Sequence, residues 1–398
     1  MKLFNKDYLF KLLKEKPKIG NDIDLSQFKF TNGTKELPSN ETLYKVGIDM
    51  SEKNRAATFI QDNEKSLYNN INKAFEGKIE IMPISDAMKK YDWLKDFYFN
   101  AVKMKDKFTA YSELYPTGGY FLRIFKNQKI EIPIQTCFLI STNQTIQNVH
   151  NIIILEEGSV AQIINGCTVQ YKAKKTLHLA VTEIYLKKNS KFIYNMIHNW
   201  SEESYVRPRT GVIIDDNSKF VSNYITLHPV KDIQLYPKAI CKGKKSSATF
   251  RNIVYSKNKS RLDLGGKIIL EGDESSGEII SHSVVSDSSV NIARSSIISK
   301  GKNTKGHIEC KGIMVSDTAK MKAIPILDSS SKSAELTHEA SIGKIDEEKL
   351  EYLMSRGFTR DKSISLIVKG FLDIEKMELT PYIKKAVRNL IDKTSEGY

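Results

Sequence analysis

Two short segments near the carboxyl end of the chain carry residue types that bind metal ions in proteins. His307-Ile308-Glu309-Cys310 places three potential ligands within four residues, and His338-Glu339 supplies two more. Imidazole, carboxylate and thiolate together suit iron or an iron–sulfur cluster, in which sulfur and nitrogen take the softer positions. These segments are therefore the first candidates for a functional site.

Strand geometry restricts what each segment does alone. Successive side chains of a strand point to opposite faces, so Cys310 points away from His307 and Glu309. The same alternation separates His338 from Glu339. We therefore do not expect one chain to surround one ion with all five residues, and the alternative is that some of them are ordinary solvated strand residues.

Other signatures of enzyme chemistry are missing. Gly301 and Gly306 have the spacing of a phosphate-binding loop, but His307-Ile308 stands where that loop needs Lys followed by Ser or Thr. No GxSxG or HExxH motif is present. The four cysteines are too far apart for a CxxC pair, and we expect Cys137, Cys167 and Cys241 to be small, reduced core residues.

Composition narrows the class of protein. The 398 residues are 40% apolar and 27% charged, which excludes wholesale disorder, and no apolar run approaches the length of a membrane span. Lys and Arg exceed Asp and Glu by 61 to 47, but the lysines are scattered and no nucleic-acid-binding motif accompanies them. With no export signal at the amino terminus, we expect a cytoplasmic protein without a membrane or nucleic-acid partner.

The elements that must position the candidate ligands form a repeat. From about residue 108 to 338 the chain alternates apolar and polar residues, as in Phe220–Leu227, without a convincing amphipathic helix. Polar turns such as Glu157-Gly158, Lys188-Asn189 and Gly301-Lys302 recur about every 14 to 15 residues. A short fixed period predicts a solenoid whose coils bury their apolar sides on one another. A parallel β-helix is the expected fold, with a β-sandwich as the alternative.

Helices are expected on both sides of this core. An amphipathic helix within Met1–Lys16 and another over Asp86–Met104 lie in a mixed amino-terminal region, residues 1–107. After the core, 108–342, the segment 343–398 carries three short amphipathic helices. Asp346, Thr359 and Thr380-Pro381 mark their starts.

The carboxyl-terminal half of the chain resembles a known family. The resemblance is carried by Glu335–Ile345, Leu350–Gly357 and Ser365–Phe371, with further matches at Ile164–Cys167, His178–Val181, Asn199-Trp200 and Leu235–Pro237. These segments are similar to the SufB/SufD family, the scaffold subunits of the SUF iron–sulfur cluster assembly machinery. The first hundred residues match poorly.

This resemblance implies a fold, partners and a site. It implies a right-handed parallel β-helix, pairing of two subunits through the solenoid, and docking of the ABC-type ATPase SufC on the carboxyl-terminal helices. ATP-driven movement of SufC would open the interface where a transient cluster is built for acceptor proteins. Cys310 lies where SufB has its scaffold cysteine, and His338 and Glu339 match the family's His-Glu pair, so Cys310, His338, Glu339 and Glu309 are the expected ligands. Burial of Cys310 in an apolar interior, far from a second subunit, would count against this site.

Two departures from SufB qualify the resemblance. Ile213 stands about where SufB has a sulfur-accepting cysteine, and the amino-terminal region lacks a CxxC motif. Both favour a reduced, minimal type, as in archaea and anaerobes, with a homodimer in place of a SufB–SufD pair. A SufD-like structural subunit without a cluster and a β-helix polysaccharide-binding protein or lyase are the alternatives.

Overall fold

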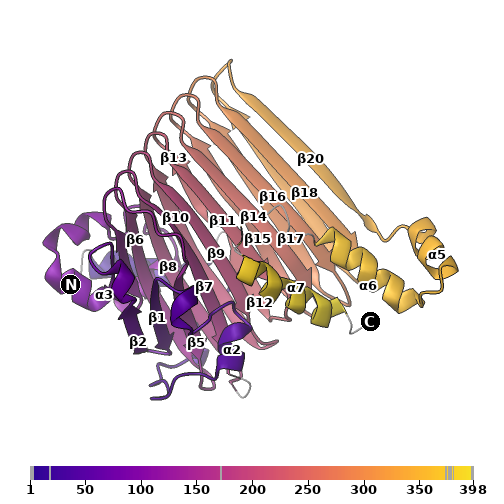
Figure 1. The fold of residues 1–398 in the computed structure, drawn as a ribbon, viewed down its shortest axis with the longest axis horizontal. Coiled ribbons are helices and arrows are strands. Elements are labelled where there is room, and N and C mark those ends of the chain that lie inside the picture. The colour runs from indigo at the N-terminus through magenta and orange to yellow at the C-terminus, as the bar shows by residue number, and fades with distance from the viewer. Residues whose placement is uncertain are drawn as a thin grey trace.

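The computed structural model describes residues 4–17, 19–170, 173–372, 374, 379 and 381–395, and its body is a β-solenoid built from two sheets (Figure 1). The first sheet has the strand order β2 (Lys65–Ile71), β1 (Ala57–Asp62), β5 (Ile134–Ile140), β7 (Val160–Val169), β9 (Lys191–Asn199), β11 (Lys219–Thr226), β14 (Ser247–Ser256), β16 (Ser276–Val285), β18 (Lys305–Met314) and β20 (Glu335–Lys344). The second has the order β19 (Lys320–Ser329), β17 (Val290–Ser299), β15 (Arg261–Leu270), β12 (Asp232–Leu235), β10 (Ser204–Ile214), β8 (Thr176–Leu186), β6 (Ile146–Leu155), β4 (Tyr120–Ile124) and β3 (Ile79–Pro83), while β13 (Lys238–Cys241) pairs with β10 and β15.

Each coil of the solenoid contributes one strand to each sheet. Lys191, Lys219, Ser247, Ser276 and Lys305 stack in register on five parallel strands, so the coils in this part of the solenoid advance by 28 or 29 residues. About eight coils follow one another between residues 121 and 344. The turn spacing seen in the sequence is half a coil, and the predicted parallel β-helix is confirmed over the sandwich alternative.

The turns repeat a left-handed backbone conformation at equivalent places. Positive φ angles of 54° to 59° occur at Asn189, Asn217, Lys245, Glu274 and Asn303. Asparagine adopts this region more readily than other residues with a side chain, because its short polar group bonds locally. The asparagine-containing turns of the sequence are therefore corners of the solenoid.

Aromatic side chains stack along the interior of the solenoid. The rings of Phe192, Phe220 and Phe250 lie on successive coils, with centroids 6.3 and 6.1 Å apart. Burying each such side chain stabilises the fold by about 1.5–3 kcal/mol. Because every coil is covered by the coils on either side, the core is continuous until the last coil, which has a neighbour on one side only.

Short helices cover the amino-terminal end of the solenoid. They are α1 (Lys6–Lys14), η1 (Leu25–Gln27), α2 (Asn40–Tyr44), η2 (Glu52–Asn54), η3 (Lys73–Phe75), α3 (Ile84–Lys90), η4 (Asp92–Phe97) and α4 (Lys107–Leu114). α1 confirms the first predicted helix, although Met1–Leu3 lies outside the described residues. The single helix predicted over Asp86–Met104 is wrong, because α3 ends at Lys90 and only a 3-10 helix follows.

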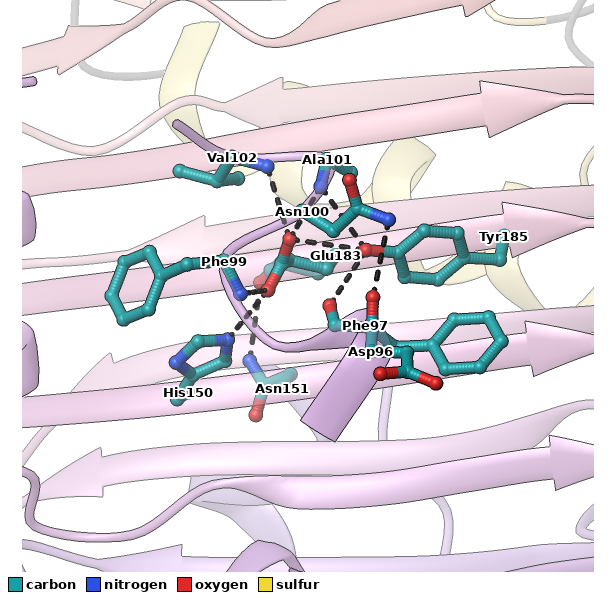
Figure 2. Close-up of polar contacts among 11 residues, drawn as sticks. Asp96, Phe97, Phe99, Asn100, Ala101, Val102, His150, Asn151, Glu183 and Tyr185 are labelled. Carbon is teal, nitrogen blue, oxygen red and sulfur yellow. Dashed lines mark hydrogen bonds and ion pairs between the residues drawn. The ribbon is translucent and has the colours of Figure 1, made fainter. Parts of the chain in front are cut away.

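A buried carboxylate holds the chain in a non-helical conformation beyond Phe97. Glu183 on β8 is fully buried and accepts hydrogen bonds from the backbone N–H groups of Phe99, Ala101 and Val102 at 2.5, 2.7 and 3.0 Å (Figure 2). His150 Nε2 lies 2.9 Å from the same carboxylate. Three N–H groups converge on one side chain only if the backbone turns sharply, and Phe99 has a φ of +52°. Glu183 therefore fastens the amino-terminal region to the solenoid.

The carboxyl-terminal helices begin where the sequence predicts. Asp346 caps α5 (Glu347–Ser355) and Thr359 caps α6 (Arg360–Phe371), each by accepting a backbone hydrogen bond. α7 (Pro381–Ser395) starts at the predicted proline, while Thr380 lies outside the described residues. α6 and α7 lie against the outer face of the first sheet, where Val368 and Val387 join a buried cluster with Val284 (Figure 1). None of the helices in the described ranges is long and apolar enough to cross a membrane.

Candidate metal centre

The candidate ligands lie on two neighbouring parallel strands at the carboxyl-terminal end of the first sheet. In the register of β18 and β20, Glu309 lies beside Glu339, and Cys310 lies beside Ala340. His338 lies beside Ile308, which is fully buried in the solenoid core. Side chains at paired positions share a face, so the sequence alternation places the two carboxylates on one face and Cys310 with His338 on the other.

Three side chains converge on the outer face. The ligand atoms of His307, Glu309 and Glu339 all lie within 4.8 Å of one another. His307 Nδ1 is 2.8 Å from Thr337 Oγ1 on the adjacent strand, which fixes the orientation of the imidazole. These side chains are half-buried or exposed, so an ion can reach them from solvent.

Glu309 is held in place by two further side chains. Lys311 Nζ lies 2.5 Å from its Oε2 atom, and His282 Nε2, on the preceding coil, lies 2.7 Å from its Oε1 atom. Partial burial alone would raise the pKa of Glu309, but the hydrogen bonds from Lys311 and His282 outweigh it and hold the pKa below its ordinary value. Glu309 is therefore an anion at neutral pH, with each of its oxygens hydrogen-bonded to a neighbouring side chain.

This donor set suits a divalent transition metal. One imidazole nitrogen with two carboxylates is a nitrogen–oxygen site of the kind that binds Fe²⁺, Mn²⁺ or Zn²⁺. An open groove of about 510 Å³ runs along the outer face of the first sheet and reaches the cluster. Its lining includes Lys219, Glu278, Lys305, His307, Glu335 and Thr337.

Cys310 lies on the opposite side of the sheet from this cluster. Its side chain is fully buried in the solenoid core, with Sγ 3.9 Å from Ser295 Oγ. Burial raises the pKa of the Cys310 thiol. Within one chain the thiol is therefore enclosed in the solenoid core and protonated, and this burial is the result stated above to count against Cys310 as a ligand.

His338 has a different environment on the same side of the sheet. It lies on β20, the last strand of the first sheet, and its side chain is exposed. The structure thus brings Glu309 and Glu339 together and places Cys310 and His338 on the interior side. It does not bring the four expected ligands together within one chain.

The last coil ends in two open strand edges. β20 and β19 are the terminal strands of the first and second sheets. Ile326 on β19 and Ile342 on β20 are 50% and 38% exposed. Terminal strands present unpaired backbone donors and acceptors to solvent, and they pair readily with another chain. Cys310 lies one coil away from these edges.

His282 and Lys311 were missed as site residues by the sequence analysis. His282 lies in register with Lys311 on the next coil. The length of a coil is the signal that could have found them. One coil separates His282 from Lys311, and one coil separates Glu309 from Glu339, so each pair lies side by side on neighbouring strands. The three other cysteines are buried, as expected, at Cys137, Cys167 and Cys241.

Comparisons with known proteins agree with the resemblance. Residues 138–371 match the family described as "SUF system FeS cluster assembly, SufBD core domain". The chain is 39% identical over 393 residues to an iron–sulfur cluster assembly SufBD family protein of Methanothermobacter thermautotrophicus, with 95% of each chain covered. It is 39% identical to a SufBD family protein of Archaeoglobus fulgidus, with 88% of this chain and 94% of that protein covered. It is 34% identical to one of Pyrococcus horikoshii, with 90% of this chain and 81% of that protein covered.

Proposed function

Because the chain belongs to the SufBD family of iron–sulfur cluster assembly proteins, we propose that it is a scaffold on which a transient cluster is built, rather than an enzyme. The observation that carries this proposal is the convergence of His307, Glu309 and Glu339 on the strands next to the open end of the solenoid. These residues receive the iron, which is cargo and leaves with the finished cluster. Acceptor proteins then take the cluster.

Cys310 supplies the thiolate of the nascent cluster in this proposal. Iron binding deprotonates a thiol, so the raised pKa of Cys310 delays thiolate formation until metal is present. Displacement of β19 and β20 exposes Cys310, and His338, which is already exposed on β20, then joins it as a ligand. The buried position protects the thiol from oxidation between rounds of assembly.

A second copy of the chain completes the site. The unpaired edges of β19 and β20, with exposed Ile326 and Ile342, fit the same edges of another subunit. Pairing there creates a self-complementary interface of the kind found in two-fold dimers. It also brings two copies of Cys310 and His338 to one junction, which supplies the ligands that one chain keeps apart.

A SufC-type ABC ATPase docks on the carboxyl-terminal helices. Tyr352 and Met354 on α5, and Phe358 just before α6, are 59%, 42% and 41% exposed. Large apolar side chains grouped on short helices are typical of a docking surface. ATP-driven movement of that partner would supply the displacement of the last coil that exposes Cys310.

Anaerobic reconstitution tests the proposed scaffold. The full-length chain is incubated with Fe²⁺ and sulfide, and cluster formation is followed by visible absorption. We expect a cluster on the unmodified chain and its loss in Cys310→Ala and His338→Ala, with strong reduction in Glu339→Gln. Cys241→Ala is the matched control, because Cys241 is also buried in the solenoid core but lies away from β18 and β20.

The outcomes separate the proposal from its alternatives. Unchanged absorption in both Cys310→Ala and His338→Ala would remove the site assignment. A chain that folds and binds the ATPase but forms no cluster would instead be a SufD-like structural subunit.

A further inference from the structure

A chain of contacts joins helix α6 to the metal-binding cluster. The ring of Phe371, at the end of α6, lies 5.5 Å from the imidazole of His282 on β16, with the two planes tilted by 36°. The other end of that imidazole lies 2.7 Å from Glu309 Oε1. One histidine therefore contacts both the helix and a carboxylate of the cluster.

Among the described residues, the side chain of His282 has one hydrogen-bond partner, Glu309. Its Nδ1 atom is buried and, among the described residues, has no hydrogen-bond partner. Phe371 and Glu309 contact the imidazole at different points and both contribute to its orientation. Lys311 is hydrogen-bonded to Oε2 of Glu309, and His282 is hydrogen-bonded to Oε1. A movement of His282 therefore changes the position of Oε1.

We propose that His282 couples the position of α6 to the affinity of the His307–Glu309–Glu339 cluster for a divalent metal ion. This inference rests on the proposed function, because it needs metal at that cluster. With α6 seated, Phe371 keeps the imidazole against Glu309, and Nε2–H holds the carboxylate oriented toward His307 and Glu339. Groups that orient metal ligands in this way commonly change metal affinity 10- to 100-fold when removed.

The coupling acts in both directions by thermodynamic necessity. If a seated α6 raises metal affinity by some factor, bound metal stabilises the seating of α6 by the same factor. A partner that pulls α6 away from the sheet lowers the affinity of the cluster for its ion. Movement of the helix thus becomes a means of releasing iron from the outer face toward the growing cluster.

Metal affinity and helix protection test this coupling on the full-length chain. Mn²⁺ serves as the probe, with its dissociation constant measured by electron paramagnetic resonance, and amide hydrogen exchange is followed over residues 360–371. We expect His282→Ala to weaken Mn²⁺ binding by roughly tenfold, and Phe371→Ala to weaken it several-fold although it does not touch the cluster. His282→Gln retains an N–H donor and restores part of the affinity. Lys362→Ala is the matched control, because Lys362 is exposed on the same helix.

We expect saturating Mn²⁺ to slow hydrogen exchange in α6 of the unmodified chain and to have no such effect in His282→Ala. Four results contradict the coupling or its premise. Tight Mn²⁺ binding with unchanged α6 exchange, or equal affinity in Phe371→Ala, would overturn the coupling while leaving the metal site in place. Absence of Mn²⁺ binding to the unmodified chain, or binding that Glu339→Gln leaves unchanged, would overturn the metal site and the coupling with it.

Discussion

Glu309 and Glu339 lie side by side on β18 and β20, with their carboxylates on the same outer face of the solenoid. Lys311 and His282 compensate the charge of Glu309, whereas no hydrogen bond or ion pair to Glu339 is found within the described ranges. Like charges directly opposite each other on paired strands destabilise a sheet. Lys311 and His282 therefore relieve the repulsion between the two carboxylates only from the side of Glu309, and a bound cation would remove what remains.

The first prediction concerns this repulsion. Without metal, Glu339→Gln should raise the free energy of unfolding by about 0.2–1 kcal/mol, because it removes the like-charge contact. Mn²⁺ at a hundred times its dissociation constant should stabilise the unmodified chain by about 2.7 kcal/mol and leave Glu339→Gln unaffected. Thermal unfolding with and without Mn²⁺ measures both effects. A variant that is less stable without metal would contradict the repulsion.

The second prediction concerns access to Cys310. All four cysteines are buried, but Cys310 alone lies on β18, next to the last coil. Terminal elements open locally at lower cost than interior ones, so iodoacetamide should modify Cys310 faster than Cys241, as measured by peptide mass spectrometry. Equal modification rates of Cys310 and Cys241 would contradict the easier opening of the last coil.

A third prediction addresses the pairing of two chains. If the edges of β19 and β20 form the interface, Ile326→Lys with Ile342→Lys should convert a dimer into a monomer, because lysines at a strand edge oppose pairing. Sedimentation velocity measures the change. Leu37→Lys is the control, since Leu37 is 46% exposed and belongs to the amino-terminal region. A dimer that survives the double substitution uses another surface.

Docking of the ATPase gives a fourth prediction. Tyr352→Ala with Met354→Ala should abolish co-purification with a SufC-type ATPase, as should truncation after Lys344. Exposed positions of this kind change the free energy of unfolding by only about 0.5 kcal/mol, so the folded chain persists. Phe10→Ala, which removes a 45% exposed aromatic ring from α1, should leave co-purification intact. Retention of the ATPase by the double variant would place its site elsewhere.

The fifth prediction is a dependence of stability on pH. Burial lowers the pKa of His178 to about 3, and burial together with the neighbouring His178 lowers the pKa of His198. Both histidines gain protons on unfolding at pH values below about 6.5, so the folded state loses stability as the pH falls through that value. From pH 7.5 to 5.5, the two should together cost about 3 kcal/mol. Urea unfolding measures the loss, and His178→Gln should remove about half of it.

Local rules explain which sequence predictions were correct. The caps at Asp346 and Thr359 depend on side chains that bond backbone groups two or three residues away. The alternation that separates Cys310 from Glu309 likewise depends only on adjacent residues in an extended strand. The helix predicted over Asp86–Met104 is interrupted after Lys90, and beyond Phe97 the backbone is bound by Glu183, which is distant in sequence.

The amino-acid sequence by itself determined the approximate spacing of the turns, the alternation that separates Cys310 from Glu309, and the family signature at the carboxyl end. Only the tertiary structure decided that His307, Glu309 and Glu339 meet, that His282 joins them to α6, and that Cys310 is enclosed. The physical reason is that stacking depends on how many residues each coil contains. The Val160–Lys191 and Lys219–Ser247 pairs show that this number varies from 31 to 28. A turn with one residue more or less changes which side chains lie beside one another, and a local pattern does not reveal that count.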